Sequence, residues 1–118
     1  MECGKFYLSL YLNLRIYESA IFKEIQTLKR QLLPNEKVIL FGSQARGDAR
    51  EDSDWDLLVL LNKDKTTRED DDKLAFPFVV MGWKKGAYIS VKLYAKKEWE
   101  SRPSLLRYNV EREGIEII

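Results

Sequence analysis

Residues 38–61 read VILFGSQARGDAREDSDWDLLVLL, and this segment decides how the rest of the chain is interpreted. Both ends of the segment are short apolar runs, which are typical of strands that are buried on both faces. The polar loop between them opens with Gly42-Ser43 and closes with Asp54 and Asp56. Small residues that let the backbone approach a ligand are thus followed by two carboxylates. This order predicts a site for phosphate and a metal ion.

The two acids are the most informative residues of the segment. Residues two apart in a strand point to the same face, so Asp54 and Asp56 are expected side by side, about 6–7 Å apart. Such carboxylates repel each other, and burial raises the cost. A divalent cation would offset both effects, and Mg²⁺ commonly takes one or two protein carboxylates together with phosphates and water. Two acids that cap a turn are the structural alternative, which the adjacent Gly42-Ser43 makes less favoured.

Gly42 and Ser43 stand where the first predicted strand ends. If a helical turn begins there, its amides and the serine hydroxyl can face an anion. An ordinary strand-to-helix turn accounts for the same two residues, so both interpretations stay open at this point. Arg46 also has two alternatives, because it could bind a phosphate or pair at the surface with Asp48 or Glu51.

Gly42 and Gly47 have the spacing of the two glycines in a P-loop. A P-loop also needs Lys and then Ser or Thr after its second glycine, where this chain has Asp48-Ala49. Without that lysine no side chain reaches the terminal phosphates, and the P-loop interpretation is rejected.

The composition indicates one globular domain over residues 1–118. The chain is 45% hydrophobic and carries three Trp, six Tyr and five Phe, which argues against disorder. A formal net charge of +1 gives no overall field that would attract nucleic acid or membranes. The chain has one cysteine and no histidine, so zinc-type ligation and His-dependent nucleophilic catalysis are not expected. Any metal needs oxygen ligands, and the lone Cys3 favours a reducing, cytoplasmic compartment.

The N-terminal region permits two interpretations. Residues 6–16 carry an apolar residue at every second position, which predicts an extra edge strand, but the same segment could extend the helix that follows. Residues 1–14 are interpreted as an N-terminal extension that lacks the basic start and cleavage site of a signal peptide. An apolar strand face would be exposed on a small monomer, so we expect the protein to oligomerise.

Hydrophobic periodicity places the remaining elements. Apolar residues spaced by three and four predict an amphipathic helix over about 15–32, which ends before Pro34. Strands are predicted at 37–41, 55–61 and 87–95, with a loop at 42–53 and a polar loop or helix start at 62–72. Helices are predicted at 76–83, 96–101 and 103–113, followed by an apolar tail at 115–118. Three acids at 70–72 are interpreted as solvated surface rather than a metal site, and Trp55 is expected in the core opposite the acid pair.

Two short motifs in this frame resemble a known family. Residues 42–47 read GSQARG and residues 53–59 read SDWDLLV, with Gly42 and Asp54 twelve positions apart. These motifs resemble the signature of the minimal nucleotidyltransferases of the DNA polymerase β superfamily, in particular the bacterial antitoxin type. The resemblance covers about residues 20–118 and includes the segment from Ile89 through Glu98-Trp99 to residues 112–115.

The resemblance implies a single α/β (α+β) domain, in which a mixed β-sheet is flanked by helices. It implies that Asp54 and Asp56 hold the metal and are catalytic, and that Gly42 and Ser43 hold the triphosphate, with Arg46 as a further candidate ligand of the nucleotide. The implied substrate is ATP, or another nucleoside triphosphate, bound with Mg²⁺. The implied reaction transfers a nucleoside monophosphate to a hydroxyl group and releases pyrophosphate. A small helical partner protein is implied as well, because bacterial members resemble antitoxins paired with a helical toxin.

One departure from the family pattern bears on activity. Family enzymes usually carry a third carboxylate on a later strand, whereas the strand predicted at 87–95 presents Ser90 and Lys92 on its polar face. Glu98 and Glu100 lie beyond that strand and could substitute only if the chain bends back. Three hypotheses therefore stand: an active nucleotidyltransferase, a nucleotide-binding subunit that no longer catalyses, and a structural interaction domain.

Overall fold

A computed structural model describes residues 16–118, so the interpretations of residues 1–14 and of most of the alternating segment lie outside the described part. Four strands form one sheet in the order β3-β2-β1-β4. The strands are β1 (Lys37–Phe41), β2 (Trp55–Leu61), β3 (Ile89–Ala95) and β4 (Ile115–Glu116). β1 is antiparallel to both β2 and β4, whereas β2 and β3 are parallel. The predicted mixed sheet is confirmed.

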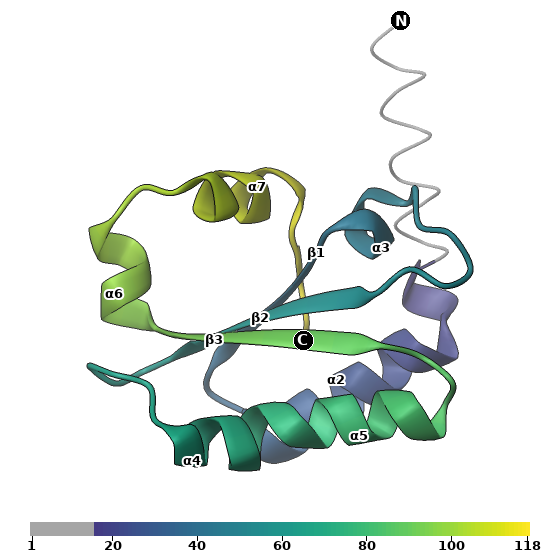
Figure 1. The fold of residues 1–118 in the computed structure, drawn as a ribbon, viewed down its shortest axis with the longest axis horizontal. Coiled ribbons are helices and arrows are strands. Elements are labelled where there is room, and N and C mark those ends of the chain that lie inside the picture. The colour runs from purple at the N-terminus through teal and green to yellow at the C-terminus, as the bar shows by residue number, and fades with distance from the viewer. Residues whose placement is uncertain (1–15) are drawn as a thin grey trace, which may run out of the picture.

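Helices cover both faces of the sheet (Figure 1). On one face lie α2 (Ala20–Leu32), α4 (Arg68–Asp70), the π-helical turn η1 (Asp71–Ala75) and α5 (Phe76–Lys84). On the other face lie α6 (Lys96–Ser101) and α7 (Leu105–Glu113), while the short α3 (Ser43–Arg46) follows β1 directly. None of the helices in residues 16–118 is long and apolar enough to cross a membrane.

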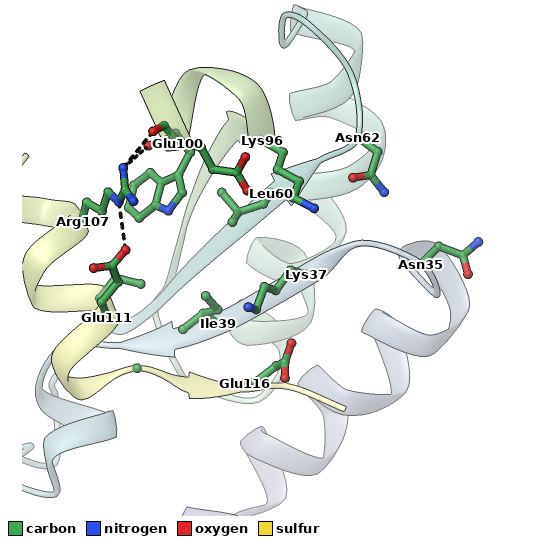
Figure 2. Close-up of a pocket in the computed structure, with 13 residues that line it drawn as sticks. Asn35, Lys37, Ile39, Leu60, Asn62, Lys96, Glu100, Arg107, Glu111 and Glu116 are labelled. Atoms are coloured by element: carbon green, nitrogen blue, oxygen red, sulfur yellow. Dashed lines mark hydrogen bonds and ion pairs between the residues drawn. The ribbon is translucent and has the colours of Figure 1, made fainter. Parts of the chain in front are cut away.

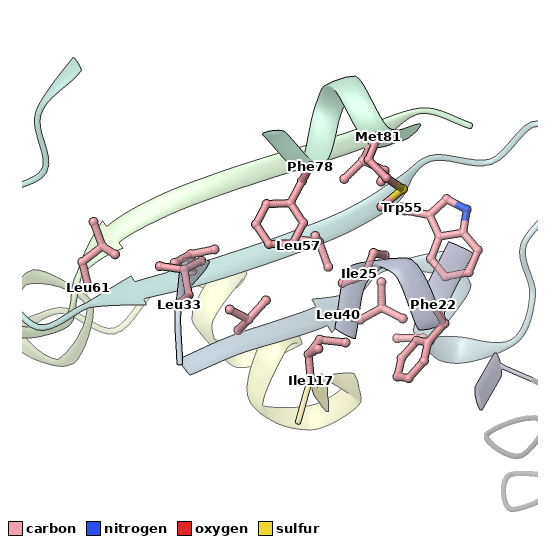
Figure 3. Packing of buried hydrophobic residues seen from close by; sticks show 14 residues of the cluster. Phe22, Ile25, Leu33, Leu40, Trp55, Leu57, Leu61, Phe78, Met81 and Ile117 are labelled. Carbon is pink, nitrogen blue, oxygen red and sulfur yellow. The ribbon is translucent and has the colours of Figure 1, made fainter. Parts of the chain in front are cut away.

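The main hydrophobic core fills the layer between the sheet and the helices α2 and α5 (Figure 3). Alternate residues of β2 point into this layer, because strand side chains alternate between the two faces. Trp55 is only 7% exposed and belongs to this core together with Phe22 and Ile25. The predicted place of Trp55 is therefore confirmed.

A smaller core lies on the other face of the sheet, beneath α6 and α7. Leu58 and Leu60 of β2 pack there with Trp99 of α6 and Val110 of α7. Asp56 shares this face with Leu58 by the alternation of the strand. α6 covers the end of the face that is distant from Asp56, and the acidic end of β2 lies beside α3 (Figure 1).

The N-terminal helix is interrupted where the spacing predicted a continuous one. Residues 16–18 form a helical turn, but Ser19 is extended, with φ −62° and ψ 134°. Its hydroxyl caps α2 by accepting a hydrogen bond from the N–H of Phe22 at 3.4 Å. Serine is a favoured cap because its oxygen satisfies an amide without a helical partner. Among the described residues, the prediction over 15–32 was therefore wrong at Ser19, where the helix is interrupted, and correct at its end, Leu32.

The helix predicted at 76–83 is the last part of a longer helical segment. Asp70 N–H donates to the hydroxyl of Thr67 at 3.2 Å, and Thr67 N–H donates to the Asp70 carboxylate at 2.8 Å, so a capping box starts α4. Asp70 also accepts from Lys63 Nζ at 2.8 Å, and this bond lowers the pKa of its carboxyl. Asp70 is thus a cap and an ion-pair partner, in line with the surface interpretation of the acids at 70–72.

The C-terminal tail forms a strand that periodicity did not predict. Ile115 pairs with Leu40 and Glu116 pairs with Ile39 in β4, which extends the sheet beyond β1. Gly114 permits this approach, because a Cβ at that position would lie 2.6 Å from Cγ2 of Ile39. Two paired residues are too few for an alternating pattern to reveal a strand.

Candidate active site

The register of the sheet brings the predicted residues to one end of it. β1 ends at Phe41, which lies opposite Asp56 in the antiparallel pairing of β1 and β2. On the other side of β2, Asp56 is paired with Ser90 in parallel register. Gly42 follows Phe41 directly, and Asp54 precedes β2 by one residue. The glycine and both acids therefore meet where β1 ends and β2 begins.

Gly42 is in the tightest part of this arrangement. Its φ of 80° lies in the region that side-chain-bearing residues rarely adopt, and its ψ is −161°. A Cβ at this position would overlap Oδ2 of Asp56 and lie 3.2 Å from its Cγ. Glycine is required here both for the backbone conformation and for the close approach, so the Gly42 backbone and the Asp56 carboxylate form one continuous surface.

The two acids differ in their surroundings. Asp54 is exposed, whereas Asp56 is half-buried. Burial raises the pKa of the Asp56 carboxyl above its usual value, and the charge of Asp54 raises it further. The positive charges of Lys92 and Arg46 lower the pKa of Asp56 to a smaller extent. The positive charges of the protein therefore compensate the negative charge of Asp54 and Asp56 only in part. A bound cation would compensate the rest.

The donor set suits a magnesium ion that is bound together with phosphate. Within residues 16–118, no three His, Cys, Asp or Glu side chains are grouped so that they could hold a metal. Two carboxylates nevertheless match the number that Mg²⁺ commonly takes from a protein, with its other ligands coming from phosphates and water. The assignment of Asp54 and Asp56 as ligands stays a prediction, and it fits a metal–nucleotide complex better than a metal held by protein alone.

A helical turn begins at Ser43, as the phosphate interpretation required. α3 spans four residues, with Gly42 as its N-cap and Gly47 in the left-handed conformation at its end. Its backbone bonds run from Arg46 N–H to Gly42 O and from Gly47 N–H to Ser43 O, both at 3.0 Å. The prediction of a loop over 42–53 was therefore wrong for residues 43–46, because a run of four residues is too short to show helical periodicity.

Side chains close the loop that carries the acids. Gln44 of α3 donates to the backbone oxygen of Ser53 at 3.3 Å. The hydroxyl of Ser53 accepts from the N–H of Arg50 at 2.7 Å. The bond from Gln44 joins α3 to the residue that precedes Asp54, so the glycine end and the acid end of the loop are held together.

Arg46 is ion-paired on two sides. Its Nε donates to Asp48 at 3.1 Å, and its Nη1 donates to both carboxylate oxygens of Glu113 at 3.2 Å. The pairing with Asp48 is one of the two alternatives that the sequence left open. These hydrogen bonds raise the pKa of Arg46, so its guanidinium stays charged. A role of Arg46 in binding the nucleotide stays a prediction, and it requires the guanidinium to share or exchange these partners.

Glu113 is the residue near the site that sequence reasoning did not single out. It is the last residue of α7, and its carboxylate accepts a hydrogen bond from Gly42 N–H at 3.1 Å. A carboxylate at a helix C-terminus is unfavourable, because that end carries the negative pole of the helix dipole. The signal available in the sequence was an acidic residue at the C-terminal end of the helix predicted at 103–113, directly before Gly114.

β3 supplies no carboxylate to the site. Ser90 and Lys92 lie on the same face of the sheet as the acid pair, as the sequence predicted. Glu98 and Glu100 belong to α6, which begins directly after Ala95, at the other end of β3. Because a strand rises about 3.3 Å per residue, that end is roughly 16 Å from Ser90. The two glutamates therefore do not replace a third carboxylate.

A cavity of about 600 Å³ lies beneath α6 and α7 at this distant end of the sheet (Figure 2). Lys37 and Leu60 line it, and they are the pair at the opposite end of the β1–β2 ladder from Phe41 and Asp56. Arg107 crosses one side of it and donates to Glu111 at 2.9 Å. This cavity is separate from the acid pair.

A second cavity, of about 500 Å³, lies beside the start of β2, and neither Asp54 nor Asp56 lines it. Ser53 and Trp55, the two neighbours of Asp54 in the chain, line it together with Tyr88, which is 63% exposed. Backbone pairing fixes this edge, because Trp55 N–H donates to the oxygen of Tyr88 at 2.8 Å. Because Trp55 points to the face opposite Asp54 and Asp56, this cavity is separate from the acid pair.

Comparison with known proteins decides the family. The model of the nucleotidyltransferase domain family matches residues 21–115. The chain belongs to this family. A putative protein adenylyltransferase of Methanocaldococcus jannaschii is 47% identical over 47 residues, and the match covers 40% of this chain and 46% of that protein. The match thus spans less than half the length of this curated relative.

Solved structures with the same fold come from toxin–antitoxin pairs. A toxin–antitoxin with AMP-PNP has a TM-score of 0.59 at 19% identity, and the superposition covers 82% of this chain and 72% of that chain. Two variants of the toxin–antitoxin MntA–HpeT give TM-scores of 0.57 and 0.56 at 16% and 19% identity, covering 71% and 70% of those chains. At such identities the likeness shows the fold alone. The family predicted from the two motifs is confirmed, and membership makes the chain a transferase by class.

Proposed function

We propose that this chain transfers the nucleoside monophosphate of Mg²⁺-bound ATP to a hydroxyl group and releases pyrophosphate. Asp54 and Asp56 hold the metal that accompanies the triphosphate, and Gly42 and Ser43 lie against the phosphates. One observation carries the proposal: the Asp56 carboxylate lies against the backbone of Gly42. The proposed metal ligand therefore adjoins the proposed phosphate turn, residues 42–46.

The chemistry needs one bond to form and one to break. An acceptor oxygen bonds to the α-phosphorus, the bond from that phosphorus to the bridging oxygen of the β-phosphate breaks, and pyrophosphate leaves. A divalent cation, when bound, supplies charge stabilisation for the attacking and leaving oxygens. Asp54 and Asp56 would hold that cation, while the glycine backbone permits the close approach of the phosphates.

The acceptor proton has no obvious carboxylate to receive it. Lys92 is exposed on the same face as the acid pair, and its charge lowers the pKa of Asp56. A lysine at this place suits an additional contact with phosphate oxygens, as a point charge, rather than proton abstraction. In this proposal the proton leaves through water or through a group of the acceptor.

ATP and a protein acceptor are proposed from the names of similar proteins. The curated relative is named a protein adenylyltransferase, and one structural neighbour is a toxin–antitoxin with AMP-PNP. We therefore propose a small helical partner protein as the carrier of the hydroxyl group.

The second candidate function is nucleotide binding without transfer. The observation that favours it is β3, where Ser90 and Lys92 stand on the face that would need a third carboxylate. Such a subunit would bind Mg²⁺-ATP through the same acid pair, and the bound nucleotide would regulate its partner. Both candidates therefore share one site and differ only in turnover.

Two radioactive labels separate these candidates. The chain, co-expressed with a candidate small helical partner protein, is incubated with Mg²⁺ and ATP labelled with ³²P at either the α- or the γ-phosphate. Nucleotidyl transfer leaves the α-label on the acceptor and the γ-label in released pyrophosphate. Label from the γ-position on the protein would instead indicate phosphorylation and contradict the proposal.

The double variant Asp54→Asn/Asp56→Asn is the matched control, because both side chains keep nearly the same shape. Transfer of the α-label should disappear in this variant. Transfer that persists would overturn the metal assignment. Binding of Mg²⁺-ATP without transfer in the wild-type complex would favour the binding subunit, and the absence of binding would favour a purely structural interaction domain.

A further inference from the structure

Glu113 connects α7 to the phosphate turn by three hydrogen bonds. Oε1 accepts from Gly42 N–H at 3.1 Å, and both carboxylate oxygens accept from Arg46 Nη1 at 3.2 Å. The side chain of Glu113 is 10% exposed, against 44% for Arg46. The carboxylate thus lies behind the turn, away from solvent, and it is the shared partner of the first and last residues of the GSQAR segment.

The β1–β4 pairing explains why Glu113 reaches Gly42. Leu40 is opposite Ile115 in the antiparallel register, and continuing this register by two residues places Gly42 opposite Glu113. At that point α7 has replaced the strand, so no backbone carbonyl is in place to accept from Gly42 N–H. The side chain of Glu113 supplies the missing acceptor.

Local preference alone does not account for a glutamate at this position. The last turns of helices favour cations, and α7 carries Arg112 there, as α2 carries Lys29 and Arg30. The close contact of Gly114 with Ile39 fixes the end of α7 on β1, so the carboxylate cannot easily move away. A charge that is unfavourable for its own helix is thus held in place by its bonds to the turn.

We propose that Glu113 is a positioning residue of the nucleotide site. Its carboxylate acts as an internal anion that holds the Gly42 backbone and α3 in the conformation that receives the triphosphate. The inference rests on the proposed function, since it concerns the same phosphate turn. Glu113 does not contact the nucleotide; it sets the direction of the groups that do.

The test compares three single variants of the full chain. Glu113→Ala removes every bond to the turn, whereas Glu113→Gln keeps an amide oxygen that can accept from Gly42 N–H. Glu111→Ala is the matched control, because Glu111 lies on the same helix and forms an ion pair with Arg107 at 2.9 Å, directed toward the other end of the sheet. Each variant is compared with the wild type well below its unfolding midpoint.

The first readout is the dissociation constant of Mg²⁺-α,β-methylene-ATP, measured by calorimetry. Removing bonds to a charged, largely buried carboxylate should weaken binding by about tenfold to a hundredfold in Glu113→Ala. Glu111→Ala should stay within about twofold of the wild type, and Glu113→Gln should fall between the two alanine variants. Equal affinity of Glu113→Ala and Glu111→Ala would overturn the positioning role.

The second readout does not need the nucleotide. Selective ¹⁵N labelling of the six glycines makes the amide of Gly42 easy to follow by NMR. Its hydrogen exchange should accelerate in Glu113→Ala and change little in Glu111→Ala. Unchanged exchange would overturn the proposal, whatever the nucleotide does. If the wild type binds no Mg²⁺-nucleotide while Gly42 exchange responds as expected, the proposed function fails, and Glu113 is shown to hold the turn.

Discussion

Replacing Gly42 by alanine tests the contact on which the site depends. Gly42 combines φ 80° with ψ −161°, a conformation that is essentially restricted to glycine and costs other residues about 1–3 kcal/mol. The added methyl group would also overlap the Asp56 carboxylate, and such overpacking costs about 1–3 kcal/mol. Gly42→Ala should therefore lower the free energy of unfolding by roughly 2–6 kcal/mol.

Gly86→Ala is the matched control for this substitution. Gly86 has a similar φ of 75°, but a Cβ there would meet no atom within 4 Å. It should lose only the backbone term, about 1–2 kcal/mol. Urea unfolding of both variants and the wild type gives the difference, because the midpoint reports stability when the slope is unchanged.

Function should separate the two glycines more clearly than stability. Relief of the overlap in Gly42→Ala has to move the Asp56 carboxylate, so the variant should lose Mg²⁺-dependent nucleotide binding even where it is folded. Gly86→Ala should keep that binding. If both variants are destabilised equally and both bind Mg²⁺-nucleotide like the wild type, the close approach of Gly42 to Asp56 is not part of the site.

Three further substitutions follow from the structure. Asp56→Asn should stabilise the metal-free protein at pH 7. The pKa of Asp56 is raised in the folded state, so the wild type loses stability as pH rises through the carboxyl range. The gain in urea midpoint of the variant over the wild type should therefore vanish below about pH 4. Ser90→Asp puts a third carboxylate beside Asp56, so it should lower the stability of the metal-free protein by up to about 1 kcal/mol. The same substitution should increase the stabilisation by Mg²⁺. A calorimetric Mg²⁺ titration that matches the wild type would contradict the expected gain in Mg²⁺ binding. Thr67→Ala should cost about 1 kcal/mol by breaking the capping box of α4, whereas Thr66→Ala should not, as thermal unfolding of the two variants can show.

The central strands and the acid pair could be predicted because burial leaves a strong pattern. β1 and β2 have the predicted bounds, since their apolar runs end abruptly at Gly42 and at the acids. Trp55 lies on the predicted face because alternation along a strand is strict. The family follows from the same segment, and its match over residues 21–115 is close to the predicted extent.

The remaining elements depend on contacts that local patterns do not contain. The break at Ser19 and the start of α4 at Thr67 are decided by capping bonds, which one or two polar residues provide. β4 exists because Gly114 permits the chain to approach Ile39. Glu113 is distant from Gly42 in sequence, and only the register of β4 brings it there. Oligomerisation stays a prediction, because it was argued from residues outside the described part.

Paramagnetic broadening of the amide NMR signals by Mn²⁺ tests the central claim most directly, because it locates the metal without assuming turnover. The ¹⁵N-labelled chain is titrated with Mn²⁺ in the presence of α,β-methylene-ATP. The signals of Gly42, Ser43, Asp54 and Asp56 should be lost first, while that of Glu111 persists, and the Asp54→Asn/Asp56→Asn variant should show no such preference. Broadening centred on residues 70–72, or an unchanged pattern in the double variant, would contradict the account.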